Sequence, residues 1–486
     1  MLFTTPEFFV FLTVVLICIE LFRKQLWQHL ILLGASYYFY WYSGSIHIFL
    51  LLAATLISYY CGQKIYSSEN IRSKKVWLTL GTGSLLIILG YFKYIDFGII
   101  TINSLFADIG IDFSIGILDV VLPIGISFFT FQALSYIFDL YLNKLEPEPS
   151  FHKYALFIAF FPSLIAGPIV RASEFLPQLR SKITITGENI QTGVTLIIWG
   201  LFKKIVIADN IGILISPVFA NPAHEASLGI IFATILFGIQ IYCDFSGYAH
   251  IAIGIAKIMG ISIPENFNMP YLAKNVQLFW RKWNMTLSRF IQDYVYIPLG
   301  GNRKGHFRTY CNLLGAMLIC GLWHGAAWTF IAWGGYHGIL LALHRYFCVE
   351  KKILANNHFI NQTDVGLFLK IVFTQILVFF GWLIFRANTW QDLTVLVYRV
   401  FCFDWLIDTM VRKVTLIGIP VGIIGIAILL SNKRIADYVK QVVTYDYLTT
   451  CSNLRLRYWI LYIFILGSAI LVLAPPKTPE FIYFAF

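Results

Sequence analysis

Long apolar runs recur along the whole chain and constrain its fold more than any other feature. They lie near residues 7–22, 26–42, 45–61, 76–92, 119–142, 190–208, 226–243, 309–333, 366–386, 414–430 and 456–475. A helix needs about 20 mostly apolar residues to cross the hydrocarbon core of a bilayer. We therefore predict an all-α polytopic membrane protein with roughly eleven to thirteen membrane helices, in which the shorter Gly- and Pro-broken stretches 153–170 and 247–263 are extra spans or re-entrant segments.

The composition supports a single integral-membrane domain over residues 1–486. Hydrophobic residues make up 58% of the chain and charged residues 13%, whereas soluble proteins average about 45–50% apolar and about 25% charged residues. The net charge of +11 is concentrated in loops between apolar runs. We therefore expect the chain to lie in the lipid bilayer and to bind no nucleic acid.

The distribution of basic residues predicts the orientation in the membrane. Arg23 and Lys24 lie between the first two runs, and a second basic group lies at 64–75, whereas 93–118 carries three aspartates and one lysine. Lys and Arg are enriched in cytoplasmic loops. This pattern places the N-terminus and 93–118 outside.

The eight cysteines are scattered, without a C-x-x-C pair or a metal-ligand spacing. Most lie in or beside apolar runs, where cysteine behaves as a small hydrophobic residue. We expect no disulfide framework, no metal site and no bound cofactor.

The longest polar stretch inside the chain, 264–308, is strongly basic. It has a single acidic residue after position 272, Asp293, against seven basic ones: Lys274, Arg281, Lys282, Arg289, Arg303, Lys304 and Arg308. One interpretation is an ordinary cytoplasmic loop. The other is a basic mouth that binds a phosphate-bearing donor from the cytoplasm.

Residues 280–294 show helical periodicity within this stretch. Apolar residues recur at Trp280, Trp283, Leu287 and Ile291, with a polar stripe at Arg281, Asn284, Ser288 and Gln292. Such a helix would lie in the membrane interface or line a cavity, and periodicity alone does not separate the two. The following stretch 297–305 contains a turn but no phosphate-binding P-loop.

His324 stands in the apolar stretch "GLWHGAAWTF" (321–330), in the helical region 309–345. Gly321 and Gly325 are four residues apart, and this spacing allows close packing of membrane helices. A histidine in such an interior is functional or is satisfied by a neighbouring helix. A neutral imidazole there would serve as a general base toward a hydroxyl.

Other partners for His324 are less favoured. On one continuous helix, His337 would lie about 220° round from His324 and so on a different face. His337 and His344 share a face but lack a carboxylate for a metal site. Cys320 shares a face with His324, and we weigh a Cys–His nucleophile pair against a buried packing cysteine.

Long blocks of the sequence resemble the membrane-bound O-acyltransferase (MBOAT) family, in particular its bacterial branch of alginate O-acetylation. They are "FFPSLIAGPIVRASEFLPQL" (160–179), "DFSGYAHIAIGIAKIMGISIPENFNMPY" (244–271), "FWRKWNMTLSRFIQDYVYIPLGGNRKG" (279–305) and "GLWHGAAWTFIAWGGYHG" (321–338), with "PIGISFFTFQALSY" (123–136) and "FGWLIFRA" (380–387). The resemblance runs through nearly the whole chain and implies a helical bundle around a central funnel or tunnel.

The resemblance also implies roles for single residues. The family's catalytic histidine falls on His324, and its second polar position falls on Asn284, where the bacterial branch often has histidine. His250 stands where that branch often has aspartate. The implied donor-binding residues are Arg281, Lys282, Ser288, Arg303 and Lys304. The implied tunnel-lining residues are Trp280, Trp283, Trp323 and His337.

The implied reaction is transfer of an acyl group, expected to be acetyl, from a cytoplasmic thioester such as acetyl-CoA to a hydroxyl. A periplasmic or extracellular serine-hydrolase-like partner would then modify a polysaccharide such as alginate. The expected location is the bacterial cytoplasmic (inner) membrane.

Two alternatives stay open. One resembles the D-alanyl transfer protein of teichoic acid modification, which would use an aminoacylated carrier protein as donor. The other is a transporter without chemistry, since intramembrane histidines and broken helices also occur in transporters. Against transport, the chain lacks a paired-half repeat and a series of intramembrane carboxylates.

Overall fold

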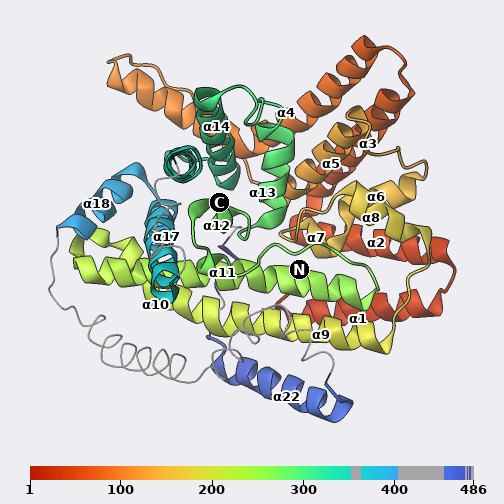
Figure 1. Cartoon of the computed structure of the whole chain (residues 1–486). Helices are drawn as coiled ribbons and strands as arrows, with labels where there is room; N and C mark the ends of the chain where they lie inside the picture. The colour runs from red at the N-terminus through yellow and green to blue at the C-terminus, as the bar shows by residue number, and fades with distance from the viewer. Residues whose placement is uncertain (352–362, 403–453, 477–478, 480, 483–486) are drawn as a thin grey trace. The chain divides into compact units, whose positions relative to one another are not determined.

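The computed structural model describes residues 1–351, 363–402, 454–476, 479 and 481–482 (Figure 1). Every regular element in these ranges is a helix, and they contain no strand. The prediction of an all-α polytopic membrane protein is confirmed. The predicted span 414–430 lies outside the described residues.

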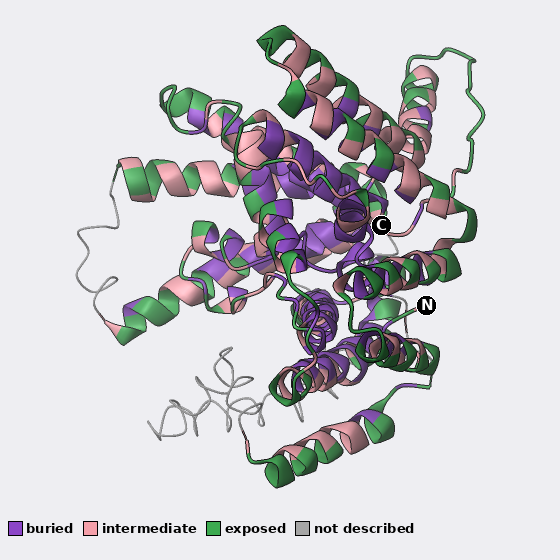
Figure 2. Cartoon of the chain, turned by 90° about the vertical axis from the view of Figure 1, so that its right-hand side faces the viewer, coloured by how far each residue is buried: buried purple, intermediate pink, exposed green. Residues whose placement is uncertain are grey.

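Six helical segments within the described ranges are long and apolar enough to cross a membrane. They are Gln25–Ser67, Ile71–Asp108, Gly187–Ala220, Ser227–Ile258, Asp364–Arg386 and Leu456–Leu473. Figure 2 shows helices with buried residues along one side and exposed residues along the other. Exposed apolar residues such as Ile87 and Leu471 would face acyl chains in a bilayer. The total of eleven to thirteen membrane helices stays a prediction.

The described chain forms two compact units, the first made of Met1–Ile197 and Tyr248–Pro264. Its helices are α1 (Pro6–Leu21), α2 (Gln25–Gly44), η1 (Ser45–His47), α3 (Ile48–Ser67), α4 (Ile71–Asp108), α5 (Ile126–Tyr141), α6 (Phe151–Ala159), α7 (Phe161–Leu164), α8 (Ala172–Phe175), η2 (Leu176–Arg180), most of α9 (Gly187–Leu201) and the end of α11 (Ser227–Ile258). Tight packing of α3 against α5 is one centre of this unit. A Cβ at Gly62 would lie 2.7 Å from Tyr136 and Leu140, so only glycine allows this approach.

The stretch 93–118, which was predicted to follow the span 76–92 and to lie outside, begins as helix. α4 continues through it to Asp108, because Ile99, Ile100 and Leu105 extend the apolar pattern. The segment that follows is held against α4 by side-chain hydrogen bonds. The Asn103 side-chain amide donates to the Ile115 carbonyl oxygen and accepts from the Ile115 backbone amide, each at 2.8 Å. The Asp96 carboxylate accepts from the backbone amides of Leu118 and Val120.

The second unit consists of Ile198–Gly247 and Glu265–Phe486. Besides the end of α9 and most of α11, it contains η3 (Phe202–Asp209), α10 (Asn210–Ala220), η4 (Pro222–His224), η5 (Pro270–Leu272), α12 (Val276–Trp280), α13 (Met285–Ile291), η6 (Gln292–Tyr296), α14 (His306–His324), α15 (Trp328–His344), η7 (Arg345–Glu350), α17 (Asp364–Arg386), α18 (Trp390–Phe401) and α22 (Leu456–Leu473). The segments η3, η6 and η7 are π-helical. Single π-helical turns are rare and occur often at functional sites.

A buried ion-pair cluster lies in this second unit and was not singled out from the sequence. The Lys204 ammonium on η3 lies 2.7 Å from Asp209 and 2.8 Å from Asp244, and all three side chains are buried. The two lysines in the apolar run 190–208 were the available signal. Because buried charges are costly unless paired, the three groups hold η3 and α11 together.

Candidate active site

His324 is the last residue of α14, at a break between two helices. The backbone turns extended at Gly325, and α15 begins at Trp328. The prediction of one continuous span over 309–333 is therefore wrong: it is interrupted at 325–327. Only 3% of His324 is exposed, so the structure places the imidazole inside the unit, at the end of a helix.

Glycines allow α14 and α15 to pack against each other immediately beside His324. A Cβ at Gly321 would lie 2.2 Å from the Phe330 carbonyl oxygen, and one at Gly334 would lie 2.3 Å from that of Met317. Any side chain at either position would force the backbones apart. The predicted close packing around His324 is confirmed.

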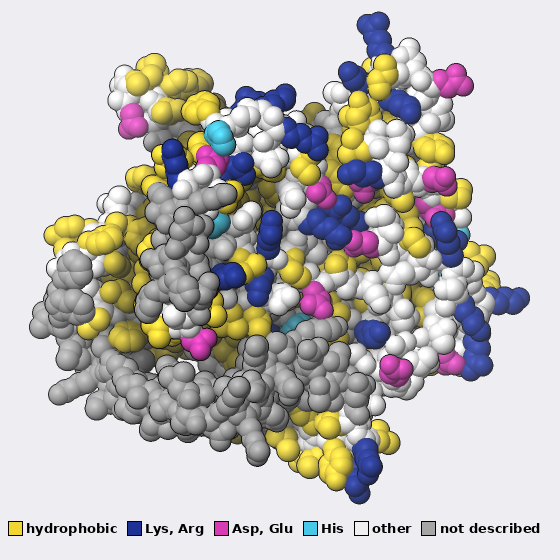
Figure 3. All heavy atoms as spheres, viewed as in Figure 1, with side chains coloured by type: hydrophobic (Ala, Val, Ile, Leu, Met, Phe, Trp, Pro, Cys, Tyr) yellow, Lys and Arg dark blue, Asp and Glu magenta, His cyan; other side chains and the backbone are white. Residues whose placement is uncertain are grey.

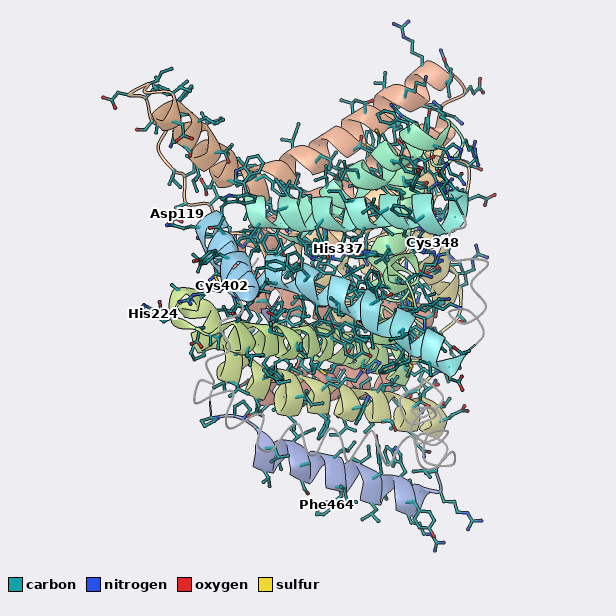
Figure 4. The ribbon with its side chains drawn as sticks, turned by 60° about the vertical axis from the view of Figure 1, so that its left-hand side comes forward. Asp119, His224, His337, Cys348, Cys402 and Phe464 are labelled. Atoms are coloured by element: carbon teal, nitrogen blue, oxygen red, sulfur yellow. The ribbon has the colours of Figure 1, made fainter. Side chains whose placement is uncertain are left out.

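Aromatic rings surround His324. Its ring centroid lies 4.9 Å from those of Trp323 and Trp333, and 5.3 Å from that of Phe385 on α17. Trp333 also lies 5.0 Å from His337. On one continuous helix His324 and His337 would lie on different faces, but the break between α14 and α15 brings both against the same indole. Figure 4 labels His337 on α15.

Asn284 stands at a second break. The predicted helix over 280–294 is interrupted, because α12 ends at Trp280 and Asn284 adopts a left-handed backbone with φ of 41° before α13 begins. The side chain is buried, and its amide nitrogen has no acceptor among the described residues. The preceding Trp283 lies 4.7 Å from Trp382, which stacks 6.1 Å from Trp333. Asn284 and His324 thus border the same aromatic cluster.

A basic cavity of about 580 Å³ lies in the same unit. Its polar lining includes four arginines, Arg281, Arg289, Arg303 and Arg345, together with Gln277, Ser288, Gln292, Asn302 and His344. Its apolar lining includes Trp280, Met317 and Cys320. Trp280 connects the cavity to the aromatic cluster, since its ring lies 5.5 Å from Trp333 and 5.1 Å from His337. Figure 3 shows Lys and Arg side chains over α13 and α14.

The structure brings only part of the predicted donor-binding set together. Arg281, Ser288 and Arg303 line the cavity, and Lys282 and Lys304 are absent from its lining. The break at 281–284 explains this for Lys282, because the turn directs neighbouring residues differently from a continuous helix. Arg289 and Arg345 were missed as donor-binding residues. Arg289 was visible in the basic stretch, but Arg345 lies beyond it, and only the pairing of α14 with α15 brings it to the cavity.

The four predicted tunnel residues are also divided. Trp280 lines the cavity, whereas Trp283, Trp323 and His337 are buried in the aromatic cluster beyond its lining. Cys320 lines the cavity, and the Cys–His pair stays a prediction. The site is therefore a basic cavity that adjoins an aromatic cluster at Trp280, and His324 lies within that cluster.

The buried imidazole of His324 and the basic cavity near its aromatic cluster lie in an all-α chain with membrane-spanning helices, which defines an integral membrane protein. A family model of membrane-bound O-acyltransferases (MBOAT) matches residues 35–386, and the chain belongs to this family.

Similar proteins narrow the class further. The chain is 38% identical to a probable alginate O-acetylase AlgI of Pseudomonas putida over 411 residues, which cover 83% of this chain and 81% of that protein. It is 37% identical to a peptidoglycan O-acetyltransferase of Helicobacter pylori, with 81% and 78% covered. It is 29% identical to a teichoic acid D-alanyltransferase of Bacillus subtilis, with 54% and 69% covered. The chain is thus a multi-pass membrane O-acyltransferase.

Proposed function

We propose that the protein transfers an acetyl group from cytoplasmic acetyl-CoA across the inner membrane for O-acetylation of an extracytoplasmic polysaccharide such as alginate. The basic cavity beside the His324 cluster is the observation that carries this proposal. Four guanidinium groups suit the phosphates of a CoA thioester, because each presents a planar fork of donors. The identities to O-acetylating relatives support acetyl as the group transferred.

The chemistry requires one base and one group that orients the thioester carbonyl or the acceptor. In the proposed step an acceptor hydroxyl attacks the thioester carbonyl, His324 takes the hydroxyl proton, and the thiolate leaves with the electrons of the broken C–S bond. The amide of Asn284 donates to the developing oxyanion.

The final acceptor lies in a compartment without CoA. We therefore propose a periplasmic or extracellular serine-hydrolase-like partner that receives the acetyl group and passes it to the polysaccharide. Peptidoglycan is the alternative polysaccharide, because a protein named peptidoglycan O-acetyltransferase shares identity with this chain. A D-alanylated carrier protein is the alternative donor, because a protein named teichoic acid D-alanyltransferase also shares identity with it.

The test follows label from radiolabelled acetyl-CoA with the purified chain in nanodiscs. His324→Ala should reduce thioester turnover and label transfer at least 100-fold, the usual scale of a lost general base (about 10²–10⁴-fold). His224→Ala, at an exposed histidine on η4, is the matched control and should keep parental turnover. Equal turnover in the parent and in a well-folded His324→Ala protein would exclude His324 from the chemistry. Turnover only with a D-alanylated carrier protein would favour the alternative donor.

A further inference from the structure

A carboxylate at the edge of the cavity organises one of its four arginines. Glu350 lies at the end of η7, and its side chain is 13% exposed. Its Oε1 accepts from Arg345 Nε at 3.0 Å and from His306 Nδ1 at 2.7 Å, and its Oε2 accepts from the Tyr310 hydroxyl. The hydrogen bond from Tyr310, with His306 and Arg345, keeps the pKa of the Glu350 carboxyl below its ordinary value against the opposing effect of burial. The group is thus held as an anion by three donors.

The π-helical form of η7 makes this pairing possible. Arg345 and Glu350 are five residues apart, and five residues on an α-helix would place them about 140° apart. In a π-helix the hydrogen bond runs from residue i to i+5, which stacks such residues on one face. The Glu350 carboxylate therefore lies beside Arg345 Nε, and His306 and Tyr310, one turn apart on α14, also contact it.

The pairing fixes the direction of the Arg345 guanidinium and leaves most of its donors available. Glu350 takes only the Nε hydrogen, and the two terminal amino groups have no acceptor within the described ranges. Arg345 itself lines the cavity. A guanidinium held at Nε presents its two terminal amino groups as a fork, the geometry that matches two oxygens of one phosphate.

We propose that Arg345 binds a phosphate of the thioester donor and that Glu350 is the positioning residue that orients it. This inference rests on the proposed function. It also separates donor classes: four arginines around one cavity suit a donor with several phosphate groups, such as CoA, whereas the pantetheine arm of a carrier protein has a single phosphate.

The experiment measures equilibrium binding of CoA and of 4′-phosphopantetheine to the purified full chain in detergent. Arg345→Gln should weaken CoA binding about tenfold, or about 1.4 kcal/mol, and Arg345→Lys should recover part of the loss. Glu350→Gln should weaken CoA binding in the same direction, and Glu350→Asp should restore it in part. Each of these changes should affect CoA more than 4′-phosphopantetheine, which has fewer phosphates to lose.

Arg308→Gln is the matched control, because Arg308 is an exposed arginine of the same basic stretch that does not line the cavity. It removes the same charge and should leave CoA binding at the parental value. Equal binding by Arg345→Gln and Arg308→Gln would overturn the inference. Tighter binding by Glu350→Gln would also overturn it, since Glu350 would then act by repelling phosphate. If the parent binds no CoA, the donor assignment itself fails, and the inference fails with it. Melting temperatures of the lysine and aspartate variants separate these results from misfolding.

Discussion

Asn284 combines a backbone requirement with a chemical one. Its φ of 41° lies in the left-handed region, which costs most residues roughly 1–2 kcal/mol and which glycine and asparagine adopt readily. Asn284→Gly should therefore keep the fold while removing the amide. We expect a near-parental melting temperature and a loss of acyl transfer of about 10²-fold, the scale of a lost oxyanion donor.

The control for this prediction is Asn143→Gly. Asn143 is also left-handed, with φ of 54°, but it is exposed. It should keep full activity in the same acetyl-transfer assay. Parental activity in Asn284→Gly would show that the asparagine is present only for its backbone conformation.

Single site residues could be predicted where local sequence determines their surroundings. His324 stood out because a histidine among glycines and tryptophans has no polar neighbour in sequence, and Asn284 followed from the family resemblance. Arg345 could not be predicted as a cavity residue, because nothing local links it to Arg281. These residues reach one cavity only through the packing of α12 against α15, of η6 against α14 and of α14 against α15.

At the scale of elements, the contact between α14 and α15 depends on glycines at fixed positions. Gly321→Ala would place a methyl group 2.2 Å from the Phe330 carbonyl oxygen, and overpacking of this kind costs about 1–3 kcal/mol. We expect a lower melting temperature for the purified protein in detergent, with activity falling as the surroundings of His324 shift.

Gly315→Ala provides the comparison on the same helix. No atom lies within 4 Å of a Cβ at Gly315, and alanine is more favourable than glycine in a helix interior by up to about 1 kcal/mol. This variant should be as stable as the parent or slightly more stable. Equal melting temperatures for the two alanine variants would contradict the close approach of α14 and α15 at Gly321.

The helices were easier to predict than the positions where they break. Apolar length is a property of composition and indicated α2, α3 and α17 correctly. The separation predicted between 226–243 and 247–263 was wrong, because α11 continues unbroken to Ile258. The interruptions at 281–284 and 325–327 contain no proline, and the apolar pattern continues through them. Tertiary packing overrides the local helical pattern there, and both candidate catalytic residues stand at these interruptions.

For the whole molecule, the charge distribution makes a prediction about sidedness. At 1.5 Å per residue, the 38-residue α4 is about 57 Å long, which exceeds the roughly 30 Å hydrocarbon core. α4 can therefore cross the bilayer and still extend beyond it. Basic residues lie at its start, in 72–75, and aspartates lie in its later part and just beyond it, in 96–119, so its start should be cytoplasmic and its end outside.

Single cysteines test this arrangement in a background without the eight native cysteines. Glu69→Cys and Asp112→Cys are exposed positions on the two sides of α4, and Arg308→Cys reports the basic stretch beside the cavity. A membrane-impermeant maleimide applied to intact spheroplasts should label position 112 alone, and positions 69 and 308 should react only after permeabilisation. A CoA thioester is anionic and does not cross the bilayer, so it reaches the protein only from the cytoplasm. The basic cavity, and position 308 beside it, should therefore open to the cytoplasm. Labelling of position 308 from outside would remove the cytoplasmic donor from the proposed function, whereas labelling of 69 and 112 from the same side would mean that α4 does not cross the bilayer.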